Sequence, residues 1–397
     1  MTRLASRPLV VAAIIFIAVL TLIPSSEAAS NPGFACIRCG DRGLSDLLLN
    51  ILLFLPFGAA LGYAGVTARR ALVYGLLFSA AIEITQLGLP GRSPTLRDIV
   101  TNGAGAWLGA LLVLNARGWF SRGTFAVPRL WTVTAVALMA VASTGWLLTP
   151  SPSEDDYYGQ WAPQLRNLGH WSGQVHEVRA GQTTIPDGRF NSAQDERDVR
   201  TTTHPLRVVA TAGNRPTRLA PIFAIADGGR RHLLMIFQEQ DDLLVRTYRR
   251  SSLLGLDTPR LRFEGAMASI GAGESFVVEL FRPFGTPTCL SINGQFECAE
   301  RFGAGSIWSA FISSESLFGA PGVLLSALAL FSLALPVGLL ARTVPRAHAI
   351  GASAVLFIGV WIAASASGLA APTPLESAAV LAALAIGWQA HRKFVQK

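Results

Sequence analysis

Charged residues are scarce in this sequence. They make up 15% of its 397 residues, whereas hydrophobic residues make up 51%. A soluble domain normally has about a quarter of its residues charged. The composition therefore excludes an ordinary soluble enzyme and a disordered chain, and we expect most of the apolar residues to face lipid.

The sequence also lacks the short motifs of common enzyme classes. It has no phosphate-binding P-loop, no glycine-rich dinucleotide loop and no Gly-x-Ser-x-Gly elbow. Its six histidines are not grouped with cysteines or acidic residues at the spacing of a zinc site. We therefore predict no metal site and no cofactor.

Basic residues are in excess, with a net charge of +8, but the excess lies outside one central segment. Residues 150–316 carry 17 arginines and 19 acidic residues. Elsewhere the basic residues are scattered between apolar runs instead of being gathered on one soluble face. This distribution disfavours a nucleic-acid partner.

Long apolar runs predict about eight membrane spans, because each can cross about 30 Å of hydrocarbon. Of the basic residues in the short connections, twelve fall on one side and four on the other. The positive-inside rule then places both termini in the cytoplasm and residues 150–316 outside. The first run is also typical of a signal peptide, and its cleavage stays open. The predicted spans are residues 8–24, 46–66, 71–89, 98–115, 129–149, 318–341, 349–370 and 375–390.

All four cysteines fall on the predicted outer side, where disulfides persist. Cys289 and Cys298 flank Asn293-Gly294, a strong two-residue hairpin turn that places them opposite each other. We predict a disulfide between these two. Cys36 and Cys39 lack the β-α-β context of a thioredoxin motif, so a small structural disulfide or two free thiols are expected there.

A few polar side chains interrupt the second, third and fourth spans. They occur in pairs three or four residues apart, which places each pair on one helical face. Such groups are costly in lipid and often functional. We predict one outward-facing polar pocket formed by Asp46, Asn50, Glu83, Gln86, Asp98 and Asn102, with Arg92 and Arg97 at its rim.

A purely structural role for these groups is the alternative. The amides would then connect helices, and Glu83 would pair with one of the two arginines. Asp46 and Asp98 would cap the N-termini of their helices.

These polar positions carry a resemblance to a known family. The chain resembles the VanZ-like membrane proteins over residues 10–115. The resemblance rests on Asp46-Leu-Leu-Leu-Asn50 continuing to Pro56-Phe57-Gly58, then Ile82-Glu83-Ile-Thr-Gln86, Arg92 to Asp98 and Asn102 to Gly109. The resemblance implies a small integral membrane bundle. Its family is named for a member associated with low-level resistance to the glycopeptide teicoplanin. Many relatives have further acidic residues where this sequence has Thr95 and Arg97, which leaves a metal-dependent enzyme short of ligands.

Residues 150–316 alternate apolar and polar positions and are rich in turn-forming residues. This pattern predicts an all-β sandwich of two antiparallel sheets, inserted between membrane helices. The aromatic residues Tyr157, Tyr158, Trp161 and Trp171 are expected to anchor at the membrane interface, with sugar stacking as the alternative. The expected strands are residues 204–210, 219–226, 232–238, 243–249, 260–266, 276–281, 288–292, 295–300 and 307–312.

This segment resembles laminin G-like and concanavalin A-like lectin/glucanase domains over residues 190–315, through the sequences at 219–228, 240–248, 275–278 and 290–294. Glucanases of that fold use paired carboxylates, typically as Glu-x-Asp-x-x-Glu. Here Glu239 and Asp241 are followed by Leu244 at the third position, so binding or scaffolding is favoured over hydrolysis. Four residues could hold calcium, although turns favour the same residue types: Asp227, Asp241, Asp242 and Asn293.

The sequence thus predicts a mixed fold, an α-helical transmembrane bundle plus an extracytoplasmic jelly-roll β-sandwich. The expected parts are a VanZ-like domain (1–115), a loop and fifth span (116–149), the β-sandwich (150–316) and C-terminal helices (317–397). We expect a bacterial cytoplasmic-membrane protein that binds membrane lipid or an envelope glycan on its outer side. One alternative is an envelope enzyme acting on a lipid-linked or phosphorylated glycan, with Glu83 or Asp98 as general base. The other is a scaffold whose β-domain binds another envelope protein.

Overall fold

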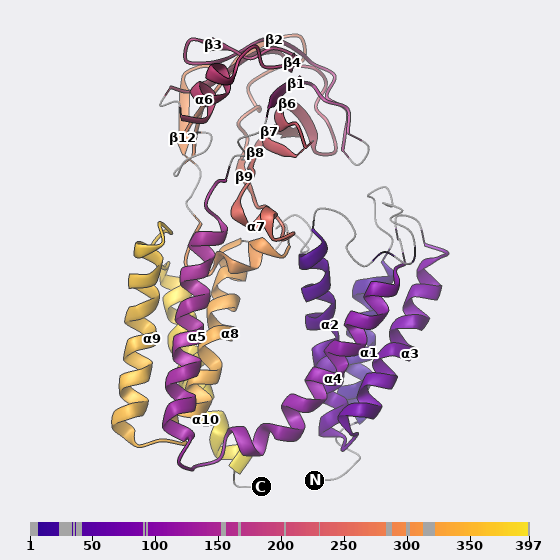
Figure 1. The fold of residues 1–397 in the computed structure, drawn as a ribbon, viewed down its shortest axis with the longest axis vertical. Helices are drawn as coiled ribbons and strands as arrows, with labels where there is room; N and C mark the ends of the chain where they lie inside the picture. Colours follow the sequence, from indigo (N-terminus) through magenta and orange to yellow (C-terminus); the bar gives the residue numbers. More distant parts are fainter. Residues whose placement is uncertain are drawn as a thin grey trace.

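The computed structural model contains long helices and a β-domain. It describes residues 7–23, 34, 36, 42–89, 92, 94–151, 156–165, 168–201, 204–229, 231–282, 288–298, 302–312 and 322–395. Within that part of the chain, eight long helices form two groups of four beneath the β-domain (Figure 1). The first helix begins, and the last one ends, at the end of the molecule farthest from the β-domain.

Small residues bring the helices of the first group close together. A Cβ atom on Gly109 would lie 2.1 Å from the carbonyl oxygen of Leu55, and one on Gly105 would lie 2.3 Å from that of Ile51. Backbones that approach this closely gain packing energy without needing a hydrophobic driving force. The group consists of α1 (Arg7–Leu22), α2 (Gly43–Tyr63), α3 (Ala68–Gln86) and α4 (Leu96–Trp119).

The second group has its own hydrophobic core, formed by residues such as Leu130, Leu330, Val337 and Leu356. Five helices of the two groups, α2, α4, α5, α8 and α9, are long and apolar enough to span a membrane. Five predicted spans are thereby supported by length and composition, and α1, α3 and α10 lie at the other three predicted positions. The second group consists of α5 (Ala126–Leu147), α8 (Gly322–Ala341), α9 (Arg346–Ala366) and α10 (Pro374–Val395).

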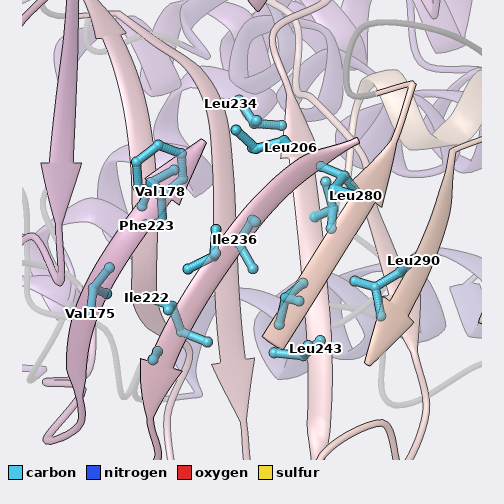
Figure 2. Close-up of a cluster of buried hydrophobic side chains, with 14 of the residues drawn as sticks. Val175, Val178, Leu206, Ile222, Phe223, Leu234, Ile236, Leu243, Leu280 and Leu290 are labelled. Atoms are coloured by element: carbon cyan, nitrogen blue, oxygen red, sulfur yellow. The ribbon is translucent and has the colours of Figure 1, made fainter. Parts of the chain in front are cut away.

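Two six-stranded antiparallel sheets form the β-domain, as the period-two pattern predicted. Their strand orders are β4-β1-β6-β7-β8-β9 and β12-β11-β10-β5-β2-β3. Side chains from both sheets share one core, shown in Figure 2 by Val178 and Leu280 of one sheet and Ile236 of the other. The strands are β1 (Tyr157–Trp161), β2 (Gln174–Ala180), β3 (Thr183–Thr184), β4 (Gly188–Arg189), β5 (Leu206–Thr211), β6 (Ala220–Asp227), β7 (His232–Glu239), β8 (Asp242–Thr247), β9 (Arg260–Phe263), β10 (Ser275–Phe281), β11 (Cys289–Ile292) and β12 (Gln295–Cys298).

Two expectations about this segment are wrong. Residues 307–312 do not form a strand, because the 3₁₀ helix η1 (Ser306–Ala310) occupies that place. Its serines bond locally: Ser306 Oγ accepts the N–H of Gly303 at 2.9 Å, which competes with strand pairing. Two of the four aromatic residues expected to anchor at the membrane interface also lie elsewhere. Tyr157 in β1 and Trp171 are buried in the core of the β-domain.

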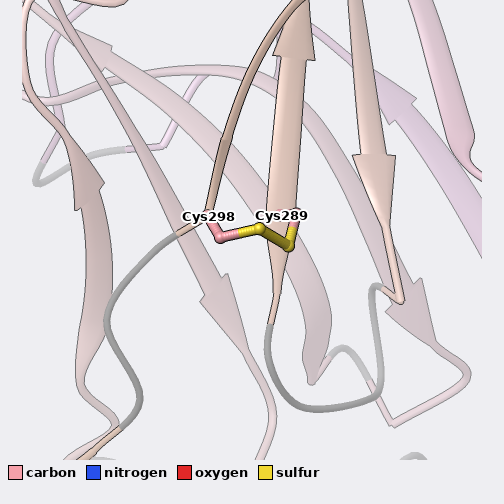
Figure 3. Close-up of a disulfide and its surroundings, with 2 residues drawn as sticks. All are labelled: Cys289 and Cys298. Carbon is pink, nitrogen blue, oxygen red and sulfur yellow. A yellow bond between two sulfur atoms is a disulfide. The ribbon is translucent and has the colours of Figure 1, made fainter.

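The Cys289–Cys298 disulfide is present as predicted (Figure 3). The two cysteines face each other across the β11–β12 hairpin. Asn293 and Gly294 in its turn have φ values of 48° and 87°, which is the left-handed region that this turn requires. Cys36 is also disulfide-bonded. Cys39 lies outside the described residues, so its pairing with Cys36 stays a prediction.

A buried arginine joins α5 to the β-domain. Arg249 is 1% exposed, and its Nη1 donates to the carbonyl of Leu148, the C-cap residue of α5. Its guanidinium lies 4.8 Å from the centre of the Phe302 ring. Burial lowers the pKa of Arg249 to about 10, so it stays protonated at neutral pH. A cation at a helix C-terminus is favourable, and this one fixes how the chain leaves the membrane helix.

We expect Arg249→Ala to weaken the contact between α5 and the β-domain and to lower the stability of the protein. It removes a charge-assisted hydrogen bond and the contact with Phe302 and leaves a cavity, at a cost of about 2–4 kcal/mol. Arg250→Ala is the matched control, since Arg250 is partly exposed and lies 5.3 Å from the Trp146 ring centre. Thermal unfolding in detergent should show a lower midpoint for Arg249→Ala alone. Equal midpoints for both variants would contradict the structural role.

Candidate functional site

Glu83 and Thr95 together fix where α4 begins. The Oε2 atom of buried Glu83 accepts the backbone N–H of Thr95 at 3.0 Å. The Thr95 hydroxyl in turn accepts the N–H of Asp98 at 3.2 Å, so Thr95 is the N-cap of α4. An N-terminal carboxylate such as Asp98 also suits the helix dipole. As a result, α4 starts at Leu96 and its first turn contains Arg97.

Arg97 lies at the centre of a polar network between α2 and α4. Its side chain is 7% exposed, with Nε 3.3 Å from Asp98 Oδ1 and Nη2 3.4 Å from Asp46 Oδ2. Asn50 Nδ2 donates to the same Asp98 oxygen at 2.6 Å. We call Asp46, Asn50, Arg97 and Asp98 the Arg97 network. The structure thus brings four of the predicted pocket residues into direct contact.

Two buried polar atoms at this site have no hydrogen-bond partner among the described residues: Nη1 of Arg97 and Oδ1 of Asn102. The amide nitrogen of Asn102 donates to Ser79 Oγ on α3 at 2.8 Å. Leaving a buried donor or acceptor unpaired costs about 1–3 kcal/mol. The Asp46 side chain, by contrast, is 44% exposed. The Arg97 network is therefore exposed mainly at Asp46, and it contains both donor and acceptor atoms.

Gln86 and Arg92 lie elsewhere, against the end of α1. Gln86 Nε2 donates to the carbonyl of Thr21 at 2.9 Å. Arg92 donates from Nε and Nη2 to the carbonyl of Ile23, at 3.1 Å and 2.6 Å. These bonds satisfy carbonyls at the C-terminal end of α1, which lack partners within the helix. In this structure the two side chains hold α1 in place beside α3.

The base of the β-domain contacts α2 beside the Arg97 network. The backbone N–H groups of Leu44 and Ser45 donate to the carbonyl of Gly255, at 3.0 Å and 3.2 Å. Ser45 Oγ donates to the Ala310 carbonyl at 3.0 Å and accepts the N–H of Asp257 at 2.8 Å. The first turn of α2 is thereby capped by residues far away in the sequence. No local signal could have identified them.

The four predicted calcium ligands of the β-domain bind basic or backbone groups of the protein instead. Asn293 Oδ1 accepts the N–H of Val277 at 2.9 Å. No group of three or more His, Cys, Asp or Glu side chains suited to a metal ion occurs among the described residues. Each aspartate meets an arginine: Asp227 with Arg231 at 2.7 Å, Asp241 with Arg215 at 2.9 Å, and Asp242 with Arg262.

The apolar helices and the buried polar network between them define a multi-pass membrane protein. Residues 10–117, which include most of α1 and all of α2 and α3, match the VanZ/LLP1 family. This match confirms the resemblance predicted from the polar motifs of the first four spans. No curated protein and no solved structure matches the chain.

Proposed function

We propose that the α1–α4 unit binds a hydroxyl-rich lipid headgroup or envelope glycan through the Arg97 network. The protein would lie in the bacterial cytoplasmic membrane with eight spans, both termini in the cytoplasm and the β-domain outside. Basic residues concentrate in the connections on the opposite side, which supports this orientation. The Cys289–Cys298 disulfide fits an oxidising compartment.

The single observation that carries the proposal is the composition of the network. Asp46 and Asp98 would supply acceptor oxygens, and Nη1 of Arg97, which has no hydrogen-bond partner among the described residues, would supply a donor. Two carboxylates surround one guanidinium, so a phosphate alone would meet more repulsion than attraction. Hydroxyl groups both donate and accept, so a sugar or polyol matches this set of atoms. Ion pairs this costly to bury are expected to have a function.

The β-domain would act beside this site. Its base caps α2 one residue before Asp46, through Gly255 and Ala310. Its two antiparallel sheets support the resemblance to lectin-like sandwiches, and it would recognise sugar or an envelope protein. By family resemblance, the proposal extends to tolerance of teicoplanin-type glycopeptides.

Native mass spectrometry of the full-length protein, gently extracted from its own membrane, tests the proposal. We expect a retained lipid or glycan mass in the wild type that is lost in Asp46→Asn, because this half-exposed carboxylate is the accessible acceptor. Asp156→Asn is the matched control, since it removes a carboxylate from an exposed pair with Arg189. A mass retained equally in both variants, or a stoichiometric protein partner without lipid or sugar, would contradict the proposal.

A further inference from the structure

The second helix of each group carries the short sequence Leu-Pro-x-Gly. Leu55-Pro56-Phe57-Gly58 of α2 corresponds to Leu335-Pro336-Val337-Gly338 of α8. Corresponding positions around this sequence are buried in both helices. Phe54, Phe57 and Gly58 are buried in α2, and the residues at the same offset in α8 are buried as well: Ala334, Val337 and Gly338.

The contacts made by these helices also correspond. A Cβ on Gly109 of α4 would meet the Leu55 carbonyl oxygen at 2.1 Å, and one on Gly387 of α10 would meet that of Leu335 at 2.8 Å. In the reverse direction, Gly58 packs on the carbonyl of Ala106 and Gly338 on that of Leu384. Each glycine therefore contacts the equivalent backbone atom in its own group. Chance similarity of two apolar helices does not reproduce contacts residue by residue.

The fourth helices begin in the same way. Thr95 caps α4 by accepting the N–H of Asp98 at 3.2 Å, and Thr373 caps α10 by accepting that of Glu376 at 3.2 Å. Thr95 follows Pro94, and Thr373 follows Pro372. The offset from the threonine to the tightly packed glycine, Gly109 or Gly387, is also the same in both helices. The chain order α1, α2, α3, α4 thus matches α5, α8, α9, α10, with the β-domain between α5 and α8.

The two groups differ in where the third helix packs. In the first group α3 packs on α4, and a Cβ on Gly75 would meet Ala106. In the second group α9 packs on α5 instead, and a Cβ on Gly359 would meet Leu138. The face of α10 that α9 leaves uncovered is exposed at Leu381. The α2–α4 and α8–α10 pairs are the parts that stay alike.

We infer that α5, α8, α9 and α10 are a second copy of the α1–α4 unit, with the β-domain inserted between its first two helices, and that the site of this copy is filled by the chain's own residues 303–308. Both copies would cross the membrane in the same direction, as parallel repeats do. This inference does not depend on the ligand proposed for the first copy.

The contacts of Glu376 and Ser326 carry the second half of the inference. These residues correspond to Asp98 and Asp46 of the Arg97 network. Glu376 is 1% exposed, and its Oε1 accepts the N–H of Gly305 at 3.1 Å. Ser326 Oγ accepts from Trp308 Nε1 at 3.0 Å. A Cβ on Gly305 would lie 2.2 Å from the Ser326 carbonyl oxygen, so only glycine fits against α8.

In the second copy, the side chains that donate hydrogen bonds to Asp98 in the first copy are replaced. Asn50, which donates to Asp98, is replaced by Leu330 at the corresponding position of α8. Glu376 accepts backbone N–H groups in place of side-chain donors, including that of Thr373 at 2.7 Å. The second copy therefore uses its carboxylate and serine to bind the chain's own residues 303–308.

Hydrogen–deuterium exchange of the full-length protein tests the filled site. In Glu376→Gln we expect peptides from residues 302–312 to exchange at least about tenfold faster, because the charge-assisted bonds to Gly305 and Thr373 are weakened. Gly305→Ala should give the same effect with Glu376 intact, which covers the case that Glu376→Gln does not fold. Glu177→Gln is the matched control, in an exposed pair with Arg179. Unchanged exchange in both site variants would overturn the filled site.

Membrane depth tests the duplication separately. No described cysteine is free, so a single added cysteine can carry a spin label. The matched exposed positions are Leu108 with Ile386 and Val100 with Ala378. We expect each pair to report the same depth within about one helical turn, roughly 5 Å. Depths that differ by more, or an inverted order along α10, would overturn the second copy.

Discussion

Gly109→Leu should prevent α2 and α4 from packing and leave almost no folded protein. A side chain at this position would start 2.1 Å from the Leu55 carbonyl oxygen and 2.7 Å from the Ala59 nitrogen. Both are backbone atoms in the middle of a helix, so neither can turn aside as a flexible side chain would. Separating the helices would cost about 4–5 kcal/mol or more, comparable to the whole stability of many domains.

Gly118→Leu provides the matched control for this prediction. Gly118 lies in the last turn of the same helix, and a Cβ there would meet nothing within 4 Å. Fluorescence-detected size-exclusion chromatography after heating gives the folded fraction of each variant. Gly118→Leu should resemble the wild type, whereas Gly109→Leu should give no folded peak. A folded peak for Gly109→Leu within about 2 °C of the wild-type midpoint would show that α2 and α4 do not meet at this glycine.

Local patterns explain which parts of the fold were predictable. The apolar runs of α2 and α8 and the period-two alternation of β6 to β8 are properties of short segments, and the structure follows them. The Asn293-Gly294 turn sets the β11–β12 register by itself, so the Cys289–Cys298 pair could be identified. In each case the information lies within a few residues of the feature.

Long-range contacts explain what was missed. Strand β1 forms because Tyr157 to Trp161 pair with β6 and β4, far along the chain. This pairing takes up aromatic residues that follow a membrane helix. From the sequence alone, their position next to α5 favoured a membrane anchor. η1 is similar, since its Ala310 carbonyl accepts from Ser45 at the start of α2.

The candidate site was predicted in part, for a related reason. Spacing alone placed Asp46, Asn50 and Asp98 near one another, but it could not distinguish Arg92 from Arg97 in the same loop. The bond from Thr95 to Glu83 decides this, because it starts α4 at Leu96 and turns Arg97 toward α2. Arg92, just outside the helix, contacts α1 instead.

Asp98→Asn should both destabilise the helical unit and remove ligand retention. Asparagine keeps the size of the side chain but removes the charge that lies 3.3 Å from Arg97 Nε. Arg97, 7% exposed, would then keep only the half-exposed Asp46 as a counter-charge. Removing one partner of a buried ion pair costs about 3–5 kcal/mol. Because Asp98 is 21% exposed, solvent screens part of this interaction, and we expect the free energy of unfolding to fall by about 2–3 kcal/mol.

A double variant separates charge balance from ligand binding. Arg97→Gln together with Asp98→Asn removes both charges, so no buried guanidinium is left without its partner, and thermal stability should recover most of the loss. Ligand retention should stay absent, because the double variant keeps neither the Asp98 carboxylate nor the guanidinium donor. Unfolding midpoints and native mass spectra of the two single variants, the double variant and the exposed-pair control Asp156→Asn provide the comparison. If the double variant were no more stable than Asp98→Asn, the network would be held by hydrogen-bond geometry and not by its charges.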